Sequence, residues 1–589
     1  MIVFPLIRKK GSNEHVMSDV FKVTLLYLIP GWIKSPQELL NFIVVLITAL
    51  GIDVILNFIR YKQITCAVSA GVTTAILQVL TPGVPLGWRI TGITAALVLG
   101  KHVWGGTGKN AVNPALAGLA IISFFYKLNF PMFNWSYWIL AASVLSLPFI
   151  LSRPYAAVGL ISGMSAFLVF SNNFSVNTLI SYGILFFGCL VITDPVTVTH
   201  KKTVGLLTGF TAGIVPLLLS NSLFVFSVSI LTFNALSRIL DDCIPERKPG
   251  RGYKKLRIKS LLPYNINTTK FADLTKPDTQ NYREESLDNL QICDILQRIK
   301  ENYVYGCGGA AFSVSQKIGA VIHSNVKTKF FVINAAECDP GLVHDKWLLH
   351  KYSVEINKGI QAVLKCVPFT ETVLAVKDNS DLNFPAGVRI TKLPEYFPVG
   401  AEKNVIRCVF NTQLNTTDIP AEKGFLVLNL QTVFAVYEAV YLNKTAGTKF
   451  ITILNLKTQE SYAAKVTLGE KIRNIVNNLY PGTVISFTGG GAMQARLVED
   501  GDVIEKTTNF ISIASMPRYK ESPLCSRCNS CTQHCPAGLE VRRIAELVDN
   551  GKPVLTAKYN PENCISCGIC SYICPAGRNL ELRIKKVLS

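Results

Sequence analysis

The first 240 residues hold the feature that most restricts the fold, a succession of long apolar runs with few charges. Each run is near the length of about 20 residues that crosses a bilayer. Several are interrupted by Gly or Pro, which is tolerated only where protein or a cavity covers the backbone. Core helices of a soluble protein are the alternative, but they would need a very large apolar core and almost no polar face. We predict about ten spans, at 17–33, 38–59, 64–81, 87–101, 111–127, 135–151, 155–171, 177–193, 203–219 and 222–240.

Charge placement gives these spans an orientation. With the N-terminus inside, the opposite-side connections hold little beyond Lys34 and Lys127. This matches the excess of Lys and Arg in cytoplasmic loops, and an even number of crossings leaves the C-terminal half in the cytoplasm. We therefore expect a multi-pass protein of the cell inner membrane. The cytoplasmic connections would carry Arg8, Lys9, Lys10, Arg60, Lys62, Lys101, Lys109, Arg153, Lys201 and Lys202.

The formal net charge of +20 needs no nucleic-acid partner. A polybasic run, "ERKPGRGYKKLRIK" at 246–259, follows the last predicted span. Such a run next to a membrane favours contact with anionic lipid. Docking of an acidic carrier protein is a second interpretation.

Half of the 16 cysteines lie in two related motifs near the C-terminus, "CSRCNSCTQHCP" from Cys525 and "CISCGICSYICP" from Cys564. Cys-x2-Cys-x2-Cys-x3-Cys-Pro is the bacterial run for 4Fe–4S clusters, and its fourth cysteine ligates the other cluster in two-cluster ferredoxins. Zinc sites usually take their four ligands as two pairs. Each motif here has three closely spaced cysteines followed by a fourth, and this pattern favours iron–sulfur clusters over zinc. We assign one cluster to Cys525, Cys528, Cys531 and Cys574, and the second to Cys564, Cys567, Cys570 and Cys535.

The segment between the two motifs, "LEVRRIAELVDNGK", has a helical pattern and suggests a helical ferredoxin module. Disulfides are not expected in a compartment that keeps thiols reduced. The remaining eight cysteines are interpreted as small buried hydrophobes. The C-terminal region is therefore predicted to carry one-electron centres.

Two loops upstream have features of a nucleotide or flavin site. "YVYGCGGAAFSVSQK" at 303–317 is a glycine-rich loop between two helix-like runs, where backbone amides can cradle phosphate. A buried strand is predicted at 330–334, and its following loop carries Glu337, Asp339 and Asp345. Acidic side chains at the carboxyl end of a strand can accept hydrogen bonds from ribose or flavin.

"GCGGAAF" and "NAAECDPG", together with "YFPVGAEKNVI" (396–406), resemble the flavin- and nicotinamide-binding region of the NADH-binding subunit of respiratory complex I. The resemblance is closer to the C subunit of Rnf-type ferredoxin–NAD oxidoreductases and covers about 286–580. It implies non-covalent FMN, NAD(H) and a β-grasp domain that ends near "FTGGGAM" (487–493). A pocket kept for folding, without a nucleotide, is the alternative. The residues that the resemblance assigns to the pocket are Gly306, Gly308, Gly309, Phe312, Lys317, Asn334, Glu337, Asp339, Gly400, Glu402, Lys403, Asn429 and Thr432.

In the apolar half, "GKHVWGGTGKNAVNPALAG" (100–118) and "ITDPVTVTHKK" (192–202) resemble the D subunit of Rnf complexes and the B subunit of the sodium-translocating NADH–quinone reductase. That family attaches a flavin to a threonine in a long outer loop. Only a short connection, 127–134, corresponds to this loop here, so no covalent flavin is expected. Asp53 and Asp194 are ionisable groups in or beside spans and hence functional candidates. Asp194 is equally well interpreted as a helix-boundary residue.

The resemblances imply a fusion of a membrane subunit with a soluble subunit, acting between ferredoxin or flavodoxin and NAD(H) with other subunits of an Rnf-like complex. In the wider family this transfer is coupled to Na⁺ or H⁺ movement. The rival hypotheses are a membrane-anchored iron–sulfur scaffold and a redox-sensing transporter, neither with dinucleotide turnover. The predicted fold is a polytopic α-helical membrane domain (1–245), a basic polar linker (246–285), an α/β flavin- or nucleotide-binding domain (286–443), a β-grasp domain (444–512) and a two-cluster ferredoxin-like domain (513–589).

Overall fold

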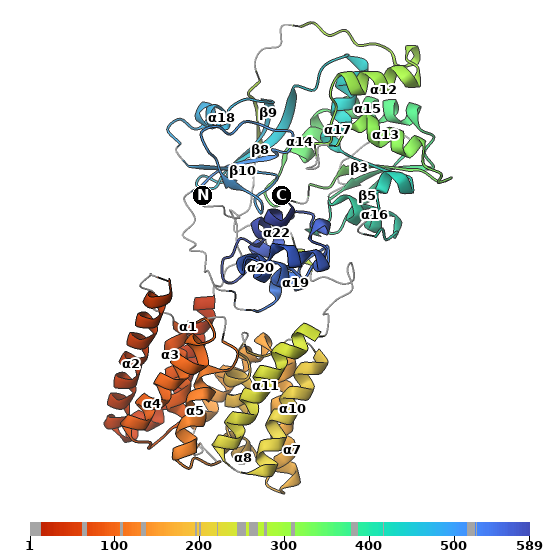
Figure 1. Ribbon diagram of the computed structural model, residues 1–589. Coiled ribbons are helices and arrows are strands. Elements are labelled where there is room, and N and C mark those ends of the chain that lie inside the picture. The colour runs from red at the N-terminus through yellow and green to blue at the C-terminus, as the bar shows by residue number, and fades with distance from the viewer. Residues whose placement is uncertain are drawn as a thin grey trace. The chain divides into compact units, whose positions relative to one another are not determined.

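A computed structural model shows that the chain forms two compact units (Figure 1). The N-terminal unit is built from 10–248 with 521–529, and the C-terminal unit from 249–520 and 530–589. The structure describes residues 13–61, 68–106, 110–130, 133, 137–194, 197–199, 202–220, 222–243, 255–257, 269–275, 280–307, 312–337, 339–377, 387–415, 418–483, 485–514, 525 and 527–588.

The described part of the N-terminal unit is helical, and each of the ten predicted ranges contains helix. Two short π-helices, η1 (Val98–His102) and η3 (Phe187–Val191), and one 3-10 helix, η2 (Leu147–Ser152), interrupt the regular pattern. The α-helices are α1 (Asn13–Lys34), α2 (Pro36–Tyr61), α3 (Val68–Leu80), α4 (Leu86–Leu97), α5 (Pro114–Phe125), α6 (Tyr137–Ser146), α7 (Pro154–Phe170), α8 (Val176–Ser181), α9 (Ile184–Phe186), α10 (Lys202–Leu219) and α11 (Leu223–Cys243).

Glycines allow α7 and α10 to pack closely. A Cβ on Gly163 would lie 2.3 Å from the carbonyl oxygen of Phe210, and one on Gly209 would lie 2.4 Å from that of Ala156. Small residues spaced four apart are typical of helix contacts in membranes, where close packing replaces the hydrophobic effect as the driving force.

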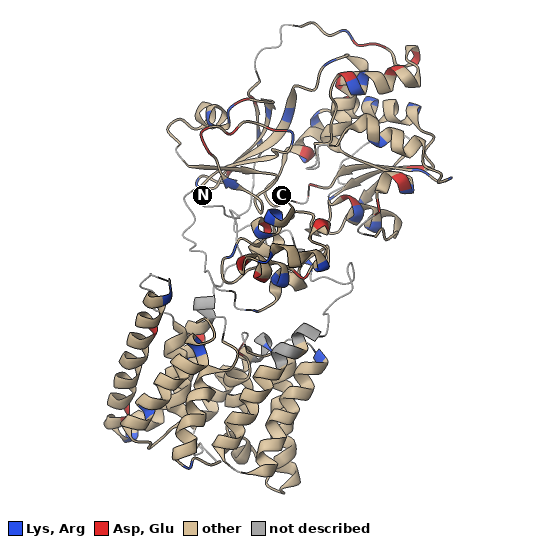
Figure 2. Cartoon of the chain, viewed as in Figure 1, with Lys and Arg blue, Asp and Glu red and all other residues tan. Residues whose placement is uncertain are grey.

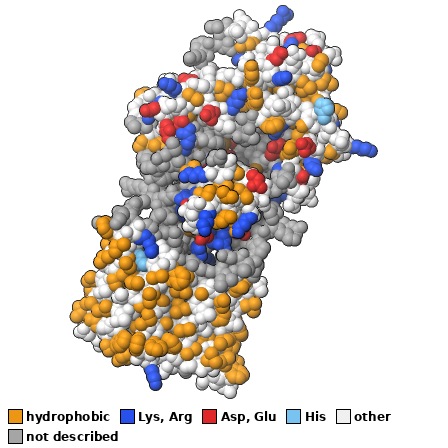
Figure 3. Space-filling model, viewed as in Figure 1, with side chains coloured by type: hydrophobic (Ala, Val, Ile, Leu, Met, Phe, Trp, Pro, Cys, Tyr) orange, Lys and Arg blue, Asp and Glu red, His pale blue; other side chains and the backbone are white. Residues whose placement is uncertain are grey.

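The outer surface of this unit is apolar. Figure 2 shows few charged residues on its helices, and Figure 3 shows hydrophobic side chains over the face in view. Ile47, Phe125 and Leu219 are each more than 60% exposed. Among the described residues, two helices are long and apolar enough to cross a membrane, at Pro36–Arg60 and Lys202–Leu219. Other apolar stretches, such as Val68–Leu80 and Leu223–Leu236, have 10–17 residues, so the predicted count of ten spans stays a prediction.

The C-terminal unit contains a parallel four-stranded sheet in the order β5–β4–β3–β7. Its strands are β3 (Phe330–Ala335), β4 (Glu371–Val376), β5 (Val388–Lys392) and β7 (Phe425–Asn429), so the strand predicted at 330–334 is confirmed. Because β3 and β7 are parallel neighbours, Asn334 and Asn429 are register partners, and the loops that follow them emerge at one edge. The associated helices are α12 (Ile292–Glu301), α13 (Val314–Ile322), α14 (His344–Lys351), α15 (Ser353–Cys366), α16 (Glu402–Phe410) and α17 (Leu430–Tyr441).

A mixed six-stranded sheet follows, in the order β11–β10–β12–β8–β9–β2. Strand β2 (Thr269–Asp273) comes from the segment predicted to be a linker, so that interpretation was wrong for these five residues. It pairs in parallel with β9, and Phe271 stacks on Trp347 of α14 with ring centroids 4.2 Å apart. The other elements are β8 (Thr448–Asn455), β9 (Glu460–Thr467), α18 (Ile472–Leu479), β10 (Ser486–Gly489), β11 (Arg496–Leu497) and β12 (Phe510–Ile513).

The cysteine-rich end is helical. Short helices α19 (Ser530–Gln533) and α21 (Ile569–Tyr572) occupy the same place in the two motifs, between the second and the fourth cysteine. The helix predicted between the motifs is α20 (Val541–Asp549), and α22 (Leu580–Leu588) closes the chain. A two-stranded pair, β1 (Leu256–Arg257) with β6 (Tyr396–Phe397), completes the described strands.

Candidate functional site

The four thiols predicted to hold the second cluster lie together. Burial raises the pKa of Cys567 well above its usual value, and the neighbouring Cys535 and Cys564 raise it further. Cys570 responds in the same way to burial and to the other three. All four are free thiols. Neighbouring thiols that form no disulfide with each other fit a metal or cluster, which binds the thiolate form.

The two motifs share a local turn that aims amides at sulfur. The N–H of Ser566 donates to the Cys564 sulfur at 3.4 Å, and the N–H of Arg527 donates to the Cys525 sulfur at 3.3 Å. Ser566 and Arg527 both have positive φ. The repeated spacing therefore folds into a repeated conformation. Such hydrogen bonds to sulfur help set the potential of an iron–sulfur cluster.

The first predicted group is divided between the two units. Cys531 and Cys574 lie in the C-terminal unit, where they pack with the same hydrophobic core as the second group. Cys525 and Cys528 lie in the stretch 521–529, which clusters with the N-terminal unit. The assignment of these four to one cluster stays a prediction.

Several predicted pocket residues meet at the carboxyl edge of the parallel sheet. Asn334 is the next-to-last residue of β3 and donates from Nδ2 to the carbonyl of Gly400 at 2.8 Å. Lys317, on α13, pairs with Glu402 at 3.2 Å and donates to the carbonyl of Val427 at 3.4 Å. Four of the residues implied by the resemblance are therefore joined across three elements.

The glycine-rich loop is fastened to the start of α17. The N–H of Cys307 donates to the buried hydroxyl of Thr432 at 3.0 Å, and the N–H of Gly306 donates to the carbonyl of Phe312 at 2.9 Å. The ring of Phe312 is 52% exposed. Gly308 and Gly309, which the resemblance also places here, lie outside the described residues. Lys403 is directed elsewhere, to the carbonyl of Asn415 at 2.9 Å.

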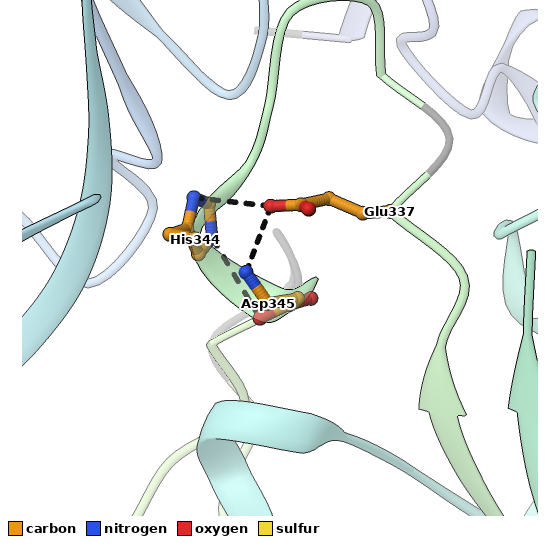
Figure 4. A group of neighbouring side chains, drawn as sticks. All are labelled: Glu337, His344 and Asp345. Atoms are coloured by element: carbon orange, nitrogen blue, oxygen red, sulfur yellow. Dashed lines mark hydrogen bonds and ion pairs between the residues drawn. The ribbon is translucent and has the colours of Figure 1, made fainter. Parts of the chain in front are cut away.

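Beside this loop, Glu337, His344 and Asp345 form a buried cluster (Figure 4). Nδ1 of His344 lies 3.3 Å from Oε1 of Glu337, and Nε2 lies 3.7 Å from Oδ1 of Asp345. Burial lowers the pKa of His344 to about 3, so its ring is neutral. Burial, and then the charge of Asp345, raises the pKa of Glu337 to about 8. Burial also raises the pKa of Asp345, to about 6.

Both oxygens of Glu337 accept main-chain hydrogen bonds at the start of α14. The N–H of Asp345 donates to Oε1 at 2.9 Å, and the N–H of Lys346 donates to Oε2 at 3.4 Å. Carboxylates favour helix N-termini because they satisfy free N–H groups there. The three side chains could hold a metal by proximity, but Glu337 already acts as a helix cap. We therefore do not assign a metal here.

Two acceptor atoms in this region lack a hydrogen-bond partner among the described residues, Oδ1 of Asp339 and Oδ1 of Asp345. The other oxygen of Asp345 accepts from Nδ2 of Asn429 at 2.9 Å. Burial raises the pKa of Asp339 to about 7. Buried polar atoms are nearly always hydrogen-bonded, so two free acceptors at one edge fit a ligand that brings donors. Ribityl and ribose hydroxyls are such donors.

The sequence reasoning placed Asp345 in the acidic loop but left it out of the pocket, and it missed three other residues. Thr452 Oγ1 lies 2.9 Å from Nδ1 of His344. Lys449 is buried, and burial lowers its pKa to about 8. Thr452 and Lys449 come from the second sheet, so no local pattern could connect them with α14. His344 starts that helix, and the Val-His-Asp-Lys boundary is the one signal that could have found it.

In the N-terminal unit Asp53 is fully buried and paired, at 2.7 Å from Nζ of Lys101 and 2.8 Å from Nε2 of His102. Lys101 was predicted to be a loop charge, but it is 2% exposed, so that placement was wrong. The π-helix η1 turns it inward towards α2. Arg153, also counted as a loop charge, is 3% exposed and donates to the carbonyl of Val198.

The two loop motifs of this unit form helix boundaries. Oδ1 of Asn113 caps α5 by accepting from the N–H of Ala115 at 3.0 Å, with Pro114 at the first position. Its Nδ2 donates to the carbonyl of Val191 at 3.1 Å. Asp194, in the connection between η3 and α10, accepts from the hydroxyl of Thr197 at 3.1 Å.

Comparison with known proteins matches the helical, the α/β and the cysteine-rich parts of the chain to three different families. Residues 2–146 match the NQR2, RnfD, RnfE family, 299–438 match the Nuo51 FMN-binding domain and 524–578 match the 4Fe-4S dicluster domain. The chain is 23% identical over 297 residues to the C subunit of the ion-translocating oxidoreductase complex of Buchnera aphidicola, covering 48% of this chain and 62% of that protein. It is 25% identical over 331 residues to cobalamin reductase PduS of Salmonella typhimurium, covering 51% and 72%.

The chain thus spans less than two thirds of the first of these relatives. A chain of the NAD⁺-reducing NiFe-hydrogenase crystal structure in the H2-reduced state aligns over 60% of this chain and 70% of its own, at 13% identity and a TM-score of 0.39, too low to support an argument.

A flavin-type α/β domain followed by two cysteine quartets defines an electron-transfer class of protein. Within that class, the chain is a fusion of an NQR2/RnfD/RnfE-family segment with an RnfC-like Nuo51 FMN-binding domain and a 4Fe-4S dicluster domain. The fusion predicted from the sequence motifs is confirmed.

Proposed function

We propose that this chain is an oxidoreductase subunit that passes electrons between ferredoxin or flavodoxin and NAD(H), through FMN and two 4Fe–4S clusters. One observation carries the proposal: the thiols of Cys535, Cys564, Cys567 and Cys570 lie together without disulfide bonds, in the same compact unit as the free buried acceptors of Asp339 and Asp345. A zinc site or a purely structural pocket would not call for both features.

The protein's own residues would hold the clusters and the flavin and orient them. The cysteine turns offer thiolates, with main-chain N–H groups directed at Cys525 and Cys564. Asp339 and Asp345 offer acceptors for ligand hydroxyls, and Thr432 fixes the glycine-rich loop. When bound, flavin exchanges electron pairs with a nicotinamide and single electrons with iron–sulfur centres.

The N-terminal unit would anchor this chemistry to the cell inner membrane. The apolar outer surface and the family match support membrane association. We infer about ten spans, with the C-terminal half in the cytoplasm and the polybasic run 246–259 near anionic lipid. Other membrane subunits would be its partners, and Na⁺ or H⁺ movement would need them. No threonine-linked flavin is expected in the chain.

Metal, sulfide and flavin analysis of the full chain, purified anaerobically in detergent, tests the proposal. Two 4Fe–4S clusters predict about eight irons with matching acid-labile sulfide, and FMN is expected in a trichloroacetic acid extract. A Cys564→Ala variant should lose about half the iron. A chain with about two zinc ions and no sulfide would contradict the electron-transfer function.

A further inference from the structure

The loop 489–494, "GGGAMQ", joins β10 to β11 and lies against the acidic loop. A Cβ built on Gly491 would lie 2.6 Å from Oδ1 of Asp339 and 2.8 Å from its Cβ. Real Cβ atoms are not found this close, so any side chain at 491 would move the Asp339 carboxylate. Asp339 is one of two residues at this edge of the sheet whose buried acceptor lacks a hydrogen-bond partner among the described residues.

The other end of the same loop holds the second cysteine motif. The side-chain amide of Gln494 donates to the carbonyl of Ser566, the residue before Cys567. On the other side of Cys567, a Cβ on Gly568 would lie 2.5 Å from the carbonyl oxygen of Met493, and Gly568 has φ +74°. Both sequence neighbours of Cys567, Ser566 and Gly568, therefore contact this loop.

The contacts at the two ends of this loop connect Asp339 with the Cys567 turn. The acidic loop, the triple-glycine loop and the cysteine turn thus form one continuous set of contacts within the C-terminal unit.

We propose that Gly491 and Gln494 are positioning residues, which make the loop 489–494 fix the Asp339 carboxylate for its ligand and the Cys567 turn for its cluster at the same time. The inference rests on the proposed function, since it takes FMN as the pocket's ligand. Because the loop touches both, a change at either end alters the other. Such coupling between sites is reciprocal and is typically 5- to 150-fold in affinity.

Each variant changes one end of the loop, and the measurement is made on the ligand at the other end. A residue with a purely local role would leave that measurement unchanged. Gln494→Met keeps the length of the side chain and removes its donor to Ser566. We expect FMN, titrated by fluorescence quenching into the anaerobic full chain, to bind about tenfold more weakly in this variant. Iron content should stay at the wild-type level, which shows that the cysteine turn still assembles.

Gly491→Ala perturbs the Asp339 end. We expect it to shift the midpoint potential of one of the two iron–sulfur EPR signals and to leave the other in place. The shifted signal should be the one that Cys567→Ser removes. Gly501→Ala is the matched control, because nothing lies within 4 Å of a Cβ at Gly501 and its φ is not in the left-handed region.

The outcomes separate this inference from the proposed function. If the wild-type chain binds no FMN, the proposed function fails. If it binds FMN, and Gln494→Met binds within twofold of wild type while Gly491→Ala leaves both EPR signals at their wild-type potentials, the positioning role is overturned. Should Gln494→Met lose iron, Gln494→Glu, which keeps the side-chain shape, replaces it with the same criteria.

Discussion

Buried carboxylates occur in both units of the molecule, but their surroundings differ. Asp53 in the N-terminal unit is enclosed by Lys101 and His102, with Asn57 donating at 3.2 Å. Asp339 and Asp345 in the C-terminal unit each keep one buried oxygen without a hydrogen-bond partner among the described residues. In the first arrangement the protein supplies the donors, whereas in the second each carboxylate has one oxygen that could accept a donor from a ligand.

The difference has a physical basis. Removing one partner of a buried charge pair leaves an uncompensated charge in a low-dielectric interior. A buried carboxylate without an ion-pair partner favours its protonated form, and burial accordingly raises the pKa of Asp339 and of Asp345. A buried ion pair is therefore satisfied within the protein, whereas the free oxygens of Asp339 and Asp345 have the capacity to accept further donors.

The largest effect should come from breaking the complete arrangement. Asp53→Asn leaves Lys101 buried without its carboxylate, which should destabilise the protein by about 3–5 kcal/mol. Thermal unfolding in detergent measures this. Asp19→Asn, at an exposed pair with Lys22, should change stability by less than about 1 kcal/mol. Equal effects of the two variants would show that the buried pair of Asp53 is no more important for stability than the exposed pair of Asp19.

The second effect is a pH dependence of the ligand-free chain. Glu337 has its folded pKa raised from 4.5 to about 8, so it takes up a proton on folding within that window. Stability should therefore be highest below pH 4.5 as far as this group is concerned, fall as the pH rises towards about 8, and stay level above. Between pH 6 and pH 8.5 about two units of this window are crossed, so the loss there should be about 3 kcal/mol, since one pKa unit corresponds to about 1.4 kcal/mol.

Unfolding midpoints at pH 6 and pH 8.5 measure that loss, and Glu337→Gln, which carries no charge at either pH, should flatten the difference. An unchanged slope in Glu337→Gln would mean that another group causes it.

The smallest predicted effect concerns the ligand. Asp345→Asn removes a buried acceptor with a raised pKa, so the unfolding temperature without ligand should stay the same or rise. FMN affinity should fall about tenfold, or about 1.4 kcal/mol, because the amide is a weaker acceptor. Asp500→Asn, at a site 81% exposed, is the control for both measurements. Lower stability with unchanged FMN affinity would show that Asp345 serves the fold alone.

The parts of the site that depend on local sequence were predictable. The cysteine spacing placed Cys535 with Cys564, Cys567 and Cys570, and these thiols do lie together. The apolar run at 330–334 predicted β3, which puts Asn334 at the sheet edge. In these cases the residues that indicate the structure lie close together in the sequence.

The remainder depends on contacts between distant segments. Lys101 reads as a loop charge until η1 turns it towards Asp53, 48 residues earlier. Residues 269–273 were interpreted as linker because their own sequence pattern does not indicate a strand. They form β2 by pairing with the edge of β9. Lys449 and Thr452 reach the pocket only because the second sheet packs against α14. No local signal carries that information.

NADH addition to the FMN-loaded full chain under strict anaerobiosis tests the central claim most directly. If the pocket and the cysteine quartets belong to one electron-transfer protein, NADH alone should produce iron–sulfur EPR signals of the kind that dithionite produces, and Asp345→Asn should need more FMN to do so. Signals that dithionite elicits but NADH does not, in a chain shown to contain FMN, would contradict it.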